Sequence, residues 1–303
     1  MKTKLSFTVT STILLLLSAC GIGVVPGSGE IVEETRAVHG YSKVVFSAPG
    51  ELTVEQNGRE GLIIEGDDNL MGYIQTRVQG NVLYIEVEPE VLQLYPSKPI
   101  RYSLDANTLT RVTLNGSGVI RSGELIASNL DFDLNGSGDI SIAAVKSQNT
   151  ALDLDGSGEY RIGSLITDQF TASLDGSGDI VMNEAILKTA NLKIAGSGKL
   201  SATDFIADTL STNMYGSGNC TLNGEVNHQS ITIYGSGSYN AEALQSRVTT
   251  VKTIGSGDSR VWASDELNIT IAGSGDIVYL GKPIVKQTVT GSGDVTELAW
   301  QSP

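Results

Sequence analysis

The sequence predicts an all-β protein, a parallel β-helix in which turns of about 20 residues stack on one another. Gly-Ser-Gly triplets recur ten times at intervals of 18 to 20 residues, and a period held this long indicates one unit stacked on copies of itself. Apolar and polar residues alternate around the triplets, and no unit carries a helical period. We expect the first glycine of each triplet to be structural: Gly116, Gly136, Gly156, Gly176, Gly196, Gly216, Gly235, Gly255, Gly273 and Gly291.

Each repeat predicts a strand that passes straight through the triplet. From Asp131 to Ile142 the even positions are apolar or glycine and the odd positions are polar, without a slip. This period of two indicates a strand with one buried face. Gly136 and Gly138 both fall on the apolar side. We therefore expect both glycines to face the interior, where a missing side chain allows neighbouring turns to approach closely.

The start of the chain predicts export and lipidation. Lys2 and Lys4 precede a short apolar stretch, and Leu17-Ser18-Ala19-Cys20 resembles a bacterial lipobox. We predict a signal peptide over residues 1–19 and a lipid, palmitate included, on Cys20 that attaches the mature chain to a membrane. Gly21 follows the cysteine, and by resemblance to diderm lipoproteins this residue implies the outer membrane. The alternative is an ordinary secretory signal with an incidental Cys20.

The rest of the chain divides into three parts. Residues 20–36 are glycine-rich and carry no strand pattern, which predicts a lipidated tether. Residues 37–111 carry strand patterns without a triplet, which predicts an N-terminal cap with opening coils. Residues 112–303 hold the regular repeats.

The second part contains one degenerate repeat. Val44 to Val54 has the repeat pattern, with Ala48-Pro49-Gly50 in the place of the triplet. Strands are expected at 61–65 and 82–87, and a surface loop at 89–99.

These features resemble a known family, the putative auto-transporter adhesin head GIN domain of bacterial envelope proteins. The resemblance covers roughly Tyr41 to Tyr239, implies a right-handed β-helix in the cell envelope, and supplies no catalytic residues. It is carried by Val44 to Val54, the Asp67-Asp68-Asn69-Leu70 turn, the strand from Gly80 to Ile85, and the run from Leu109 to Gly118.

The net charge and the cysteine content indicate which binding partners and disulfides to expect. The net charge of −14 leaves no basic surface to neutralise a phosphate backbone, so we expect no nucleic-acid partner. The sequence has two cysteines. If Cys20 carries lipid, Cys220 has no disulfide partner and is expected to be a small buried apolar residue.

Carboxylates at outward positions of the early turns are weak calcium candidates: Asp133, Asp139, Asp153, Asp155, Asp175 and Asp179. Stacked carboxylates about 4.8 Å apart repel each other, and calcium between turns would relieve the repulsion. The spacing does not match the nonapeptide calcium repeat. A solvated acidic face is the other interpretation, and we expect no cofactor.

Other chemistry finds little support in the sequence. The triplet serines have no base, because neither His39 nor His228 lies in a triplet. No helix follows the glycines to form a phosphate loop, and His228 with Cys220 cannot complete a zinc site. Some β-helix proteins are polysaccharide lyases or hydrolases. Candidate residues for such an enzyme are Arg111, Arg121 and Arg161, on turns that could face one side.

The resulting hypothesis is a non-catalytic, lipid-anchored envelope protein. Its β-helical scaffold would bind a surface glycan or a protein through its polar, acidic flank. A carbohydrate-active enzyme is the alternative.

Overall fold

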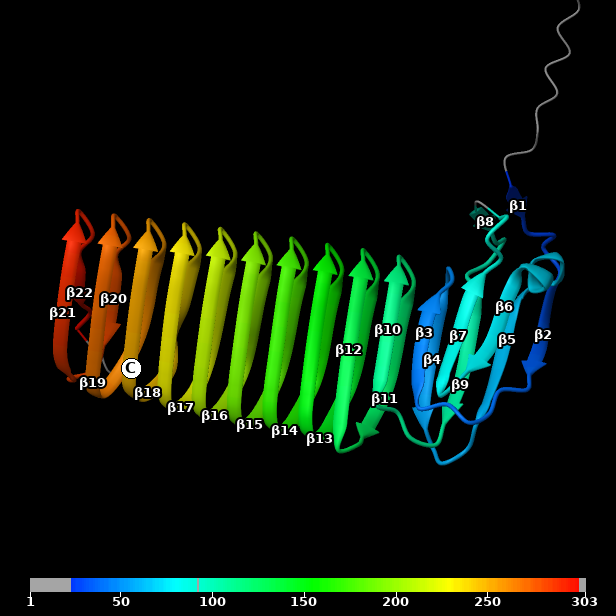
Figure 1. The fold of residues 1–303 in the computed structure, drawn as a ribbon, viewed down its shortest axis with the longest axis horizontal. Helices are drawn as coiled ribbons and strands as arrows, with labels where there is room; N and C mark the ends of the chain where they lie inside the picture. Colours follow the sequence, from blue (N-terminus) through cyan, green and yellow to red (C-terminus); the bar gives the residue numbers. More distant parts are fainter. Residues whose placement is uncertain (1–22, 92, 300–303) are drawn as a thin grey trace, which may run out of the picture.

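A computed structural model describes residues 23–91 and 93–299, so the predicted signal peptide and Cys20 lie outside the described residues. The chain forms a parallel β-solenoid of about 9 turns of roughly 20 residues, as the sequence predicts. The coils stand in a row along one axis, with a smaller group of strands at the N-terminal end (Figure 1). Within the described residues, no helix has the length and hydropathy needed to cross a membrane.

Each regular coil consists of two layers joined by the triplet at one corner. A strand of one layer ends at the first glycine, and a strand of the other layer begins just after the second glycine. Strands of neighbouring coils pair in parallel, with residue i opposite residue i+20 in the regular part. The strands of this part are β10 (Arg111–Gly116), β11 (Val119–Ile126), β12 (Asn129–Gly136), β13 (Asp139–Gly156), β14 (Glu159–Gly176), β15 (Asp179–Gly196), β16 (Lys199–Gly216), β17 (Asn219–Gly235), β18 (Ser238–Gly255) and β19 (Asp258–Gly273).

The prediction of one strand through each triplet, with both glycines inside, is wrong. The second glycine of every triplet is buried, but the first is partly or fully exposed and has a φ between 97° and 146°. At Gly136 a Cβ atom would lie 2.5 Å from the carbonyl oxygen of Gly116. Apolar alternation cannot distinguish this corner from a straight strand, because the parity of inward positions is the same on both sides of it. The glycines are structural, as expected, but they form a turn.

Inward side chains stack in columns that run through successive coils. One column contains Phe132, Leu152, Ala172 and Leu192, all buried and all in register. Since neighbouring strands lie about 4.8 Å apart, each inward side chain is covered by the coil before it and the coil after it. A single coil cannot bury its own apolar face, so the stack folds as a whole.

The degenerate repeat forms the first coil, as the sequence predicts. β3 (Lys43–Ser47) pairs in parallel with β10, and β4 (Glu51–Gln56) pairs in parallel with β11. This register places Ala48-Pro49-Gly50 directly under the first triplet.

Beyond this coil the sheet changes to antiparallel pairing. β7 (Val82–Val87) and β9 (Arg101–Ala106) still stack in parallel on β3 and β4. Three further strands then pair antiparallel and cover the end of the stack: β2 (Ile31–Arg36), β5 (Gly61–Asp67) and β6 (Ile74–Gln79). The strands expected at 61–65 and 82–87 are confirmed.

The remaining elements lie at the two ends of the solenoid. A 3₁₀ helix η1 (Asp68–Tyr73) links β5 to β6. The loop expected at 89–99 holds a short strand, β8 (Gln93–Tyr95), which pairs with β1 (Val24–Pro26), so that prediction is wrong for these three residues. The last coils contain β20 (Ile277–Leu280), β21 (Ile284–Gly291) and β22 (Val295–Glu297).

Candidate binding site

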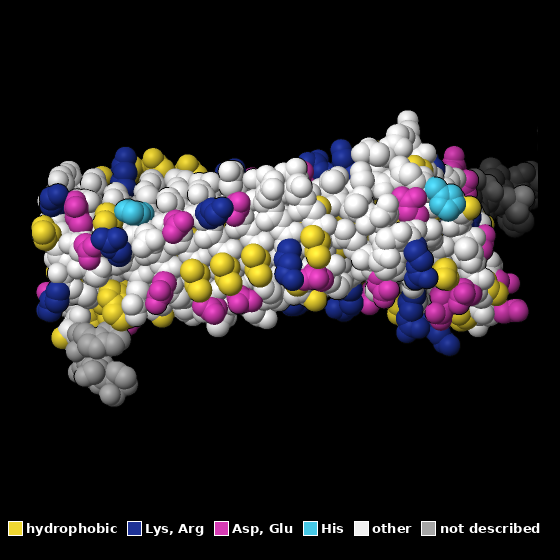
Figure 2. All heavy atoms as spheres, turned by 90° about the horizontal axis from the view of Figure 1, so that it is seen from below, with side chains coloured by type: hydrophobic (Ala, Val, Ile, Leu, Met, Phe, Trp, Pro, Cys, Tyr) yellow, Lys and Arg dark blue, Asp and Glu magenta, His cyan; other side chains and the backbone are white. Residues whose placement is uncertain are grey.

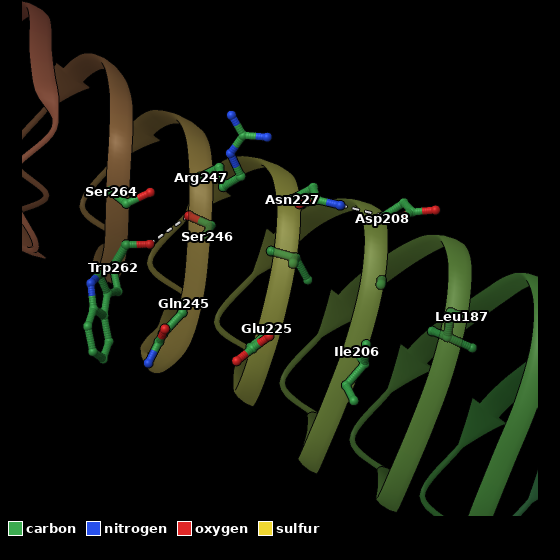
Figure 3. Close-up of a pocket in the computed structure, with 12 residues that line it drawn as sticks. Leu187, Ile206, Asp208, Glu225, Asn227, Gln245, Ser246, Arg247, Trp262 and Ser264 are labelled. Atoms are coloured by element: carbon green, nitrogen blue, oxygen red, sulfur yellow. Dashed lines mark hydrogen bonds between the residues drawn. The ribbon is translucent and has the colours of Figure 1, made fainter.

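The uniform outer surface is interrupted where the coils become shorter. The interval between triplets falls from 20 to 19 residues between Gly216 and Gly235, and the strand register shifts between Thr221 and Gly224. A further shift between Ala241 and Gln245 accompanies the later 18-residue coils. A groove with a volume of about 360 Å³ opens at this corner (Figure 3).

The floor of the groove is made of small and apolar side chains. Leu187, Ala207 and Val226 come from three successive coils and are all buried. Ser246 continues this row in register with Val226, and its hydroxyl donates to the carbonyl oxygen of Trp262 at 2.6 Å. The groove therefore runs along the solenoid axis and becomes more polar toward the later coils.

One wall follows the outward row Ile206, Glu225, Gln245 and Trp262, whose members lie opposite one another in successive strands. The Trp262 side chain is half-buried and, with Gln245 and Glu225, projects from the same side of the coils (Figure 3). This wall combines an aromatic ring, an amide and a carboxylate.

Exposed isoleucines lead to this wall from the regular coils. Ile166, Ile186 and Ile206 are in register and about 40% exposed each. Figure 2 shows hydrophobic side chains lined up along this flank of the rod. Stacked branched side chains on a sheet stabilise each other across strands, so this row is explained by packing between coils.

The opposite wall is polar and charged. The side-chain amide of Asn227 donates to Asp208 at 3.1 Å, and the Arg247 guanidinium lies 3.0 Å from Asp265. The Ser264 hydroxyl, and then Arg247, hold the pKa of the Asp265 carboxyl below its ordinary value. The Arg247 charge is thus already paired.

A buried polar network supports the groove from inside. The Gln229 side-chain amide donates to Ser246 at 3.0 Å and to Thr249 at 3.1 Å, and it accepts a bond from the Tyr239 hydroxyl at 3.0 Å. Burial raises the pKa of Tyr239 well above its ordinary value, so the phenol remains protonated. The network fixes Ser246, whose side chain lines the floor of the groove.

The predicted calcium candidates do not come together. Asp133 and Asp153 lie opposite each other on one layer, and Asp155, two residues further along the strand, lies opposite Asp175 of the next coil. Asp139 and Asp179 belong to the other layer, beyond the triplet corner. Among residues 23–91 and 93–299, no group of three or more His, Cys, Asp or Glu side chains is placed to hold a metal ion.

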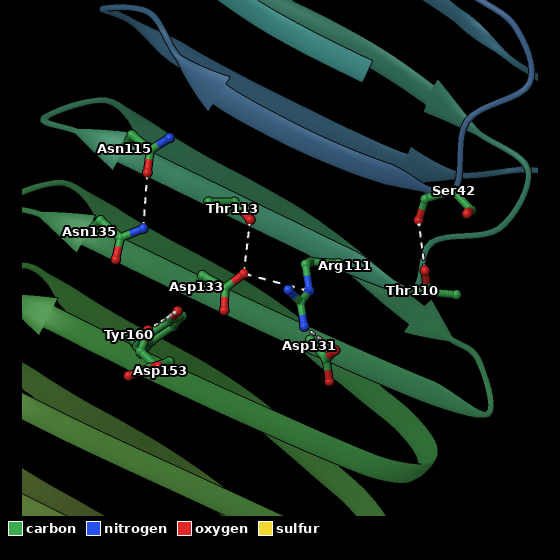
Figure 4. Close-up of polar contacts among 10 residues, drawn as sticks. All are labelled: Ser42, Thr110, Arg111, Thr113, Asn115, Asp131, Asp133, Asn135, Asp153 and Tyr160. Atoms are coloured by element: carbon green, nitrogen blue, oxygen red, sulfur yellow. Dashed lines mark hydrogen bonds and ion pairs between the residues drawn. The ribbon is translucent and has the colours of Figure 1, made fainter. Parts of the chain in front are cut away.

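Neighbouring side chains already pair with Asp133, the carboxylate that lies opposite Asp153 (Figure 4). Asp133 accepts a hydrogen bond from Thr113 at 2.9 Å and lies 3.7 Å from the Arg111 guanidinium, which also contacts Asp131 at 2.8 Å. One coil further, partial burial and then the charges of Asp133 and Asp155 raise the pKa of Asp153. The acidic face is therefore partly neutralised at its N-terminal edge and repulsive beyond it.

The three arginines considered for an enzyme do not share one face, which corrects that expectation. Arg121 and Arg161 lie on one layer and Arg111 on the other. Each is paired: Arg121 with Glu51 at 3.0 Å, Arg161 with Glu159, and Arg111 with Asp131. The triplet serines are exposed along one edge. From Ser137 onward their N–H groups donate to glycine carbonyls of the preceding coil, as Ser157 does to Gly136 at 2.8 Å.

A known protein family matches most of this chain in sequence. The family model described as "Putative auto-transporter adhesin, head GIN domain" matches residues 40–204 and 187–283. The chain belongs to this family. An adhesin family of this kind indicates a protein of the cell surface or envelope. No curated protein is significantly similar to the chain in sequence.

Solved structures share the fold of this chain. A putative adhesin from Parabacteroides distasonis is 20% identical with a TM-score of 0.57, and one from Parabacteroides merdae is 21% identical with a TM-score of 0.54. A structure described as a putative lipid binding protein from Parabacteroides distasonis is 21% identical with a TM-score of 0.52. Each alignment covers 91% of this chain and 100% of the other chain. At these identities the likeness concerns the fold alone.

Two further features of this head GIN protein bear on the search for a site. Cys220 is fully buried, as expected, and burial raises the pKa of its thiol. Tyr215 and Tyr234 form an exposed stacked pair with ring centroids 5.2 Å apart, which sequence reasoning missed. Their alignment could have been found by counting back one residue from each triplet, since both tyrosines directly precede a first glycine.

Proposed function

We propose that this protein is a non-catalytic, lipid-anchored adhesin of the outer membrane, whose rod presents a binding surface for a surface glycan or protein. Its membership in the head GIN family supports an adhesive role at the cell surface or envelope. The lipobox-like sequence at Cys20 supports the anchor, and acyl chains such as palmitate on that cysteine would hold the protein at the bilayer.

The observation that carries this proposal is the direction of the rod relative to the anchor. β1 begins at Val24, four residues after Cys20, and belongs to the capped end of the solenoid (Figure 1). Lipid on Cys20 would therefore keep the cap beside the membrane. At about 4.8 Å per coil, the groove lies between about 20 and about 40 Å further along the rod. Such a geometry displays the shortened coils away from the headgroups.

The test combines surface exposure with adhesion. Cells that carry the wild-type protein are expected to lose it to an added protease and to incorporate labelled palmitate into it, and Cys20→Ala is expected to abolish both signals. Adherence to immobilised mucin and fibronectin is compared between these cells, the Cys20→Ala strain and a deletion strain. Equal adherence of wild-type and deletion strains would contradict the adhesive role, and protease resistance in intact cells would contradict outward display.

A further inference from the structure

We propose that the groove at the shortened coils is a saccharide-binding site for a linear, uncharged oligosaccharide. The inference rests on the proposed adhesive function and names the ligand class and its place. Three observations carry it: the shape of the groove, the chemistry of its walls and their charge.

The shape of the groove suits a chain of sugar rings. It crosses the coils from Leu187 to Trp262, a length of roughly 20 Å at about 4.8 Å per coil, so several rings fit in a line. The floor of Leu187, Ala207 and Val226 is apolar, and its members come from successive strands. A pyranose ring has an apolar face of C–H groups that packs against such a floor.

The walls of the groove supply an aromatic surface and hydrogen-bonding groups for the hydroxyl groups of a sugar ring. Trp262 offers an aromatic surface at the polar end, and aromatic rings combine a large contact area with little loss of side-chain entropy. Glu225 and Gln245 beside it, and Asn227 and Asp208 opposite, present acceptors and donors to both edges of a ring (Figure 3). Hydroxyl groups both donate and accept, so they match this mixture of carboxylates and amides.

The charge of the walls favours a neutral ligand. Asp208 and Glu225 are acidic, whereas the Arg247 guanidinium is paired with Asp265 at 3.0 Å. An anionic polymer such as a uronic-acid chain would meet these carboxylates while Arg247, the cation among the described lining residues, is already paired, and the net charge of −14 adds to the repulsion.

An extended peptide suits the groove less well. The backbone groups of the coils already bond to neighbouring coils along the axis, in the parallel ladders from β16 to β19. A peptide that followed the groove would cross these strands and could not extend the sheet. It would lose the main-chain hydrogen bonds that give strand-adding ligands their affinity.

The experiment uses the full mature chain with Trp300→Phe, which leaves Trp262 as the single tryptophan. Xylotetraose, cellotetraose, mannotetraose and chitotetraose are titrated by calorimetry and tryptophan fluorescence, with tetragalacturonate as the anionic comparison. We expect at least one neutral tetrasaccharide to bind and to change the Trp262 emission, and tetragalacturonate to bind at least about tenfold more weakly.

Variants locate the site. Trp262→Ala in an otherwise wild-type chain and, separately, Glu225→Gln test the groove by calorimetry, and Tyr215→Ala, an exposed aromatic residue outside the groove, is the matched control. We expect Trp262→Ala to weaken binding about tenfold or more and Tyr215→Ala to leave the affinity unchanged. Glu225→Gln keeps the fold and the shape, so a changed affinity there supports the site even if Trp262→Ala unfolds.

The outcomes separate this inference from the proposed function. Saccharide binding that none of the groove variants alters, binding of tetragalacturonate alone, or preferential binding of a peptide overturns the saccharide groove. Adherence to fibronectin without binding of any tetrasaccharide also overturns it, while the adhesive role stands. Wild-type and deletion strains that adhere equally contradict the adhesive role itself, whereas purified protein that binds a neutral tetrasaccharide through Trp262 would still support the groove.

Discussion

The regular coils and the shortened coils differ in their cores as well as in their lengths. Between Asp139 and Gly196 the repeat keeps 20 residues and the interior is largely aliphatic and aromatic. Six of the nine buried polar or charged side chains described lie instead between residues 212 and 259. The shortened coils therefore combine a more polar interior with most of the groove outside, whereas the regular coils bury only two polar side chains, Thr150 and Thr167, and contribute Leu187 to the groove floor.

The difference in coil length distinguishes the regular coils, which act as a scaffold, from the shortened coils, which form most of the groove. Where every coil has the same length, outward side chains form straight rows with residue i opposite residue i+20. Loss of one residue near Gly224 shifts the strand register there, and the groove opens over the residues that directly follow the shift. In a solenoid, a change of period is thus the place where a ligand site can form without an insertion.

The largest expected effect tests the corner of the regular coils. Gly176 has a φ of 126°, and a Cβ atom there would lie 2.3 Å from the carbonyl oxygen of Gly156. Gly176→Ala combines left-handed strain with a backbone clash, and we expect it to lower the free energy of unfolding by about 3 kcal/mol. Urea unfolding followed by far-ultraviolet circular dichroism measures the change.

Gly123→Ala is the matched control for that substitution. Gly123 has no heavy atom within 4 Å of the added Cβ and has an ordinary backbone conformation. Its substitution should leave stability within about 0.5 kcal/mol of the wild type. Similar losses for both glycines would show that the triplet corner has no special requirement for glycine.

A middle-sized effect tests the polar core of the shortened coils. Gln229→Leu removes the hydrogen-bond partner of the buried Tyr239 hydroxyl, while Thr249 keeps its bond to Ser246, and a buried group without a partner costs about 1–3 kcal/mol. We expect a loss of about 2 kcal/mol and a change in the groove, because Ser246 loses its donor.

Thr150→Val provides the comparison in the regular coils. The Thr150 hydroxyl is buried but contacts only Ser147, at 2.6 Å, so valine should cost about 1 kcal/mol or less. Thermal unfolding of both variants by calorimetry ranks them. An equal cost would mean that the network around Gln229 is no more cooperative than the short chain of hydroxyls Thr150, Ser147 and Thr167.

The sequence was sufficient for the fold and insufficient for the site. The triplet period and the apolar alternation determine which residues stack, and the Ala48-Pro49-Gly50 coil followed from the same pattern. The outward orientation of Gly136 could not be predicted, because the parity of inward positions is unchanged across the corner. The intervals of 19 and 18 residues between triplets are a sequence signal for the groove. The intervals alone do not reveal that Trp262 lines the groove, because the register shifts decide which side chains lie opposite each other there.

The smallest expected effect tests the acidic face of the regular coils. The pKa of Asp153 is raised from 3.8, first by burial and then by Asp133 and Asp155. The folded protein therefore holds this proton more tightly than the unfolded chain, and stability falls as the pH rises through the folded pKa. Asp153→Asn removes that loss, so we expect the melting temperature to rise by about 1–2 °C at pH 7 and to be unchanged at pH 3. Asp139→Asn is the control on the other layer, where the Arg161 guanidinium lies 3.9 Å from the carboxylate, and it should give no gain. A gain for both aspartates, or a gain for Asp153→Asn that persists at pH 3, would show that net charge or packing, and not the raised pKa, makes this face unfavourable.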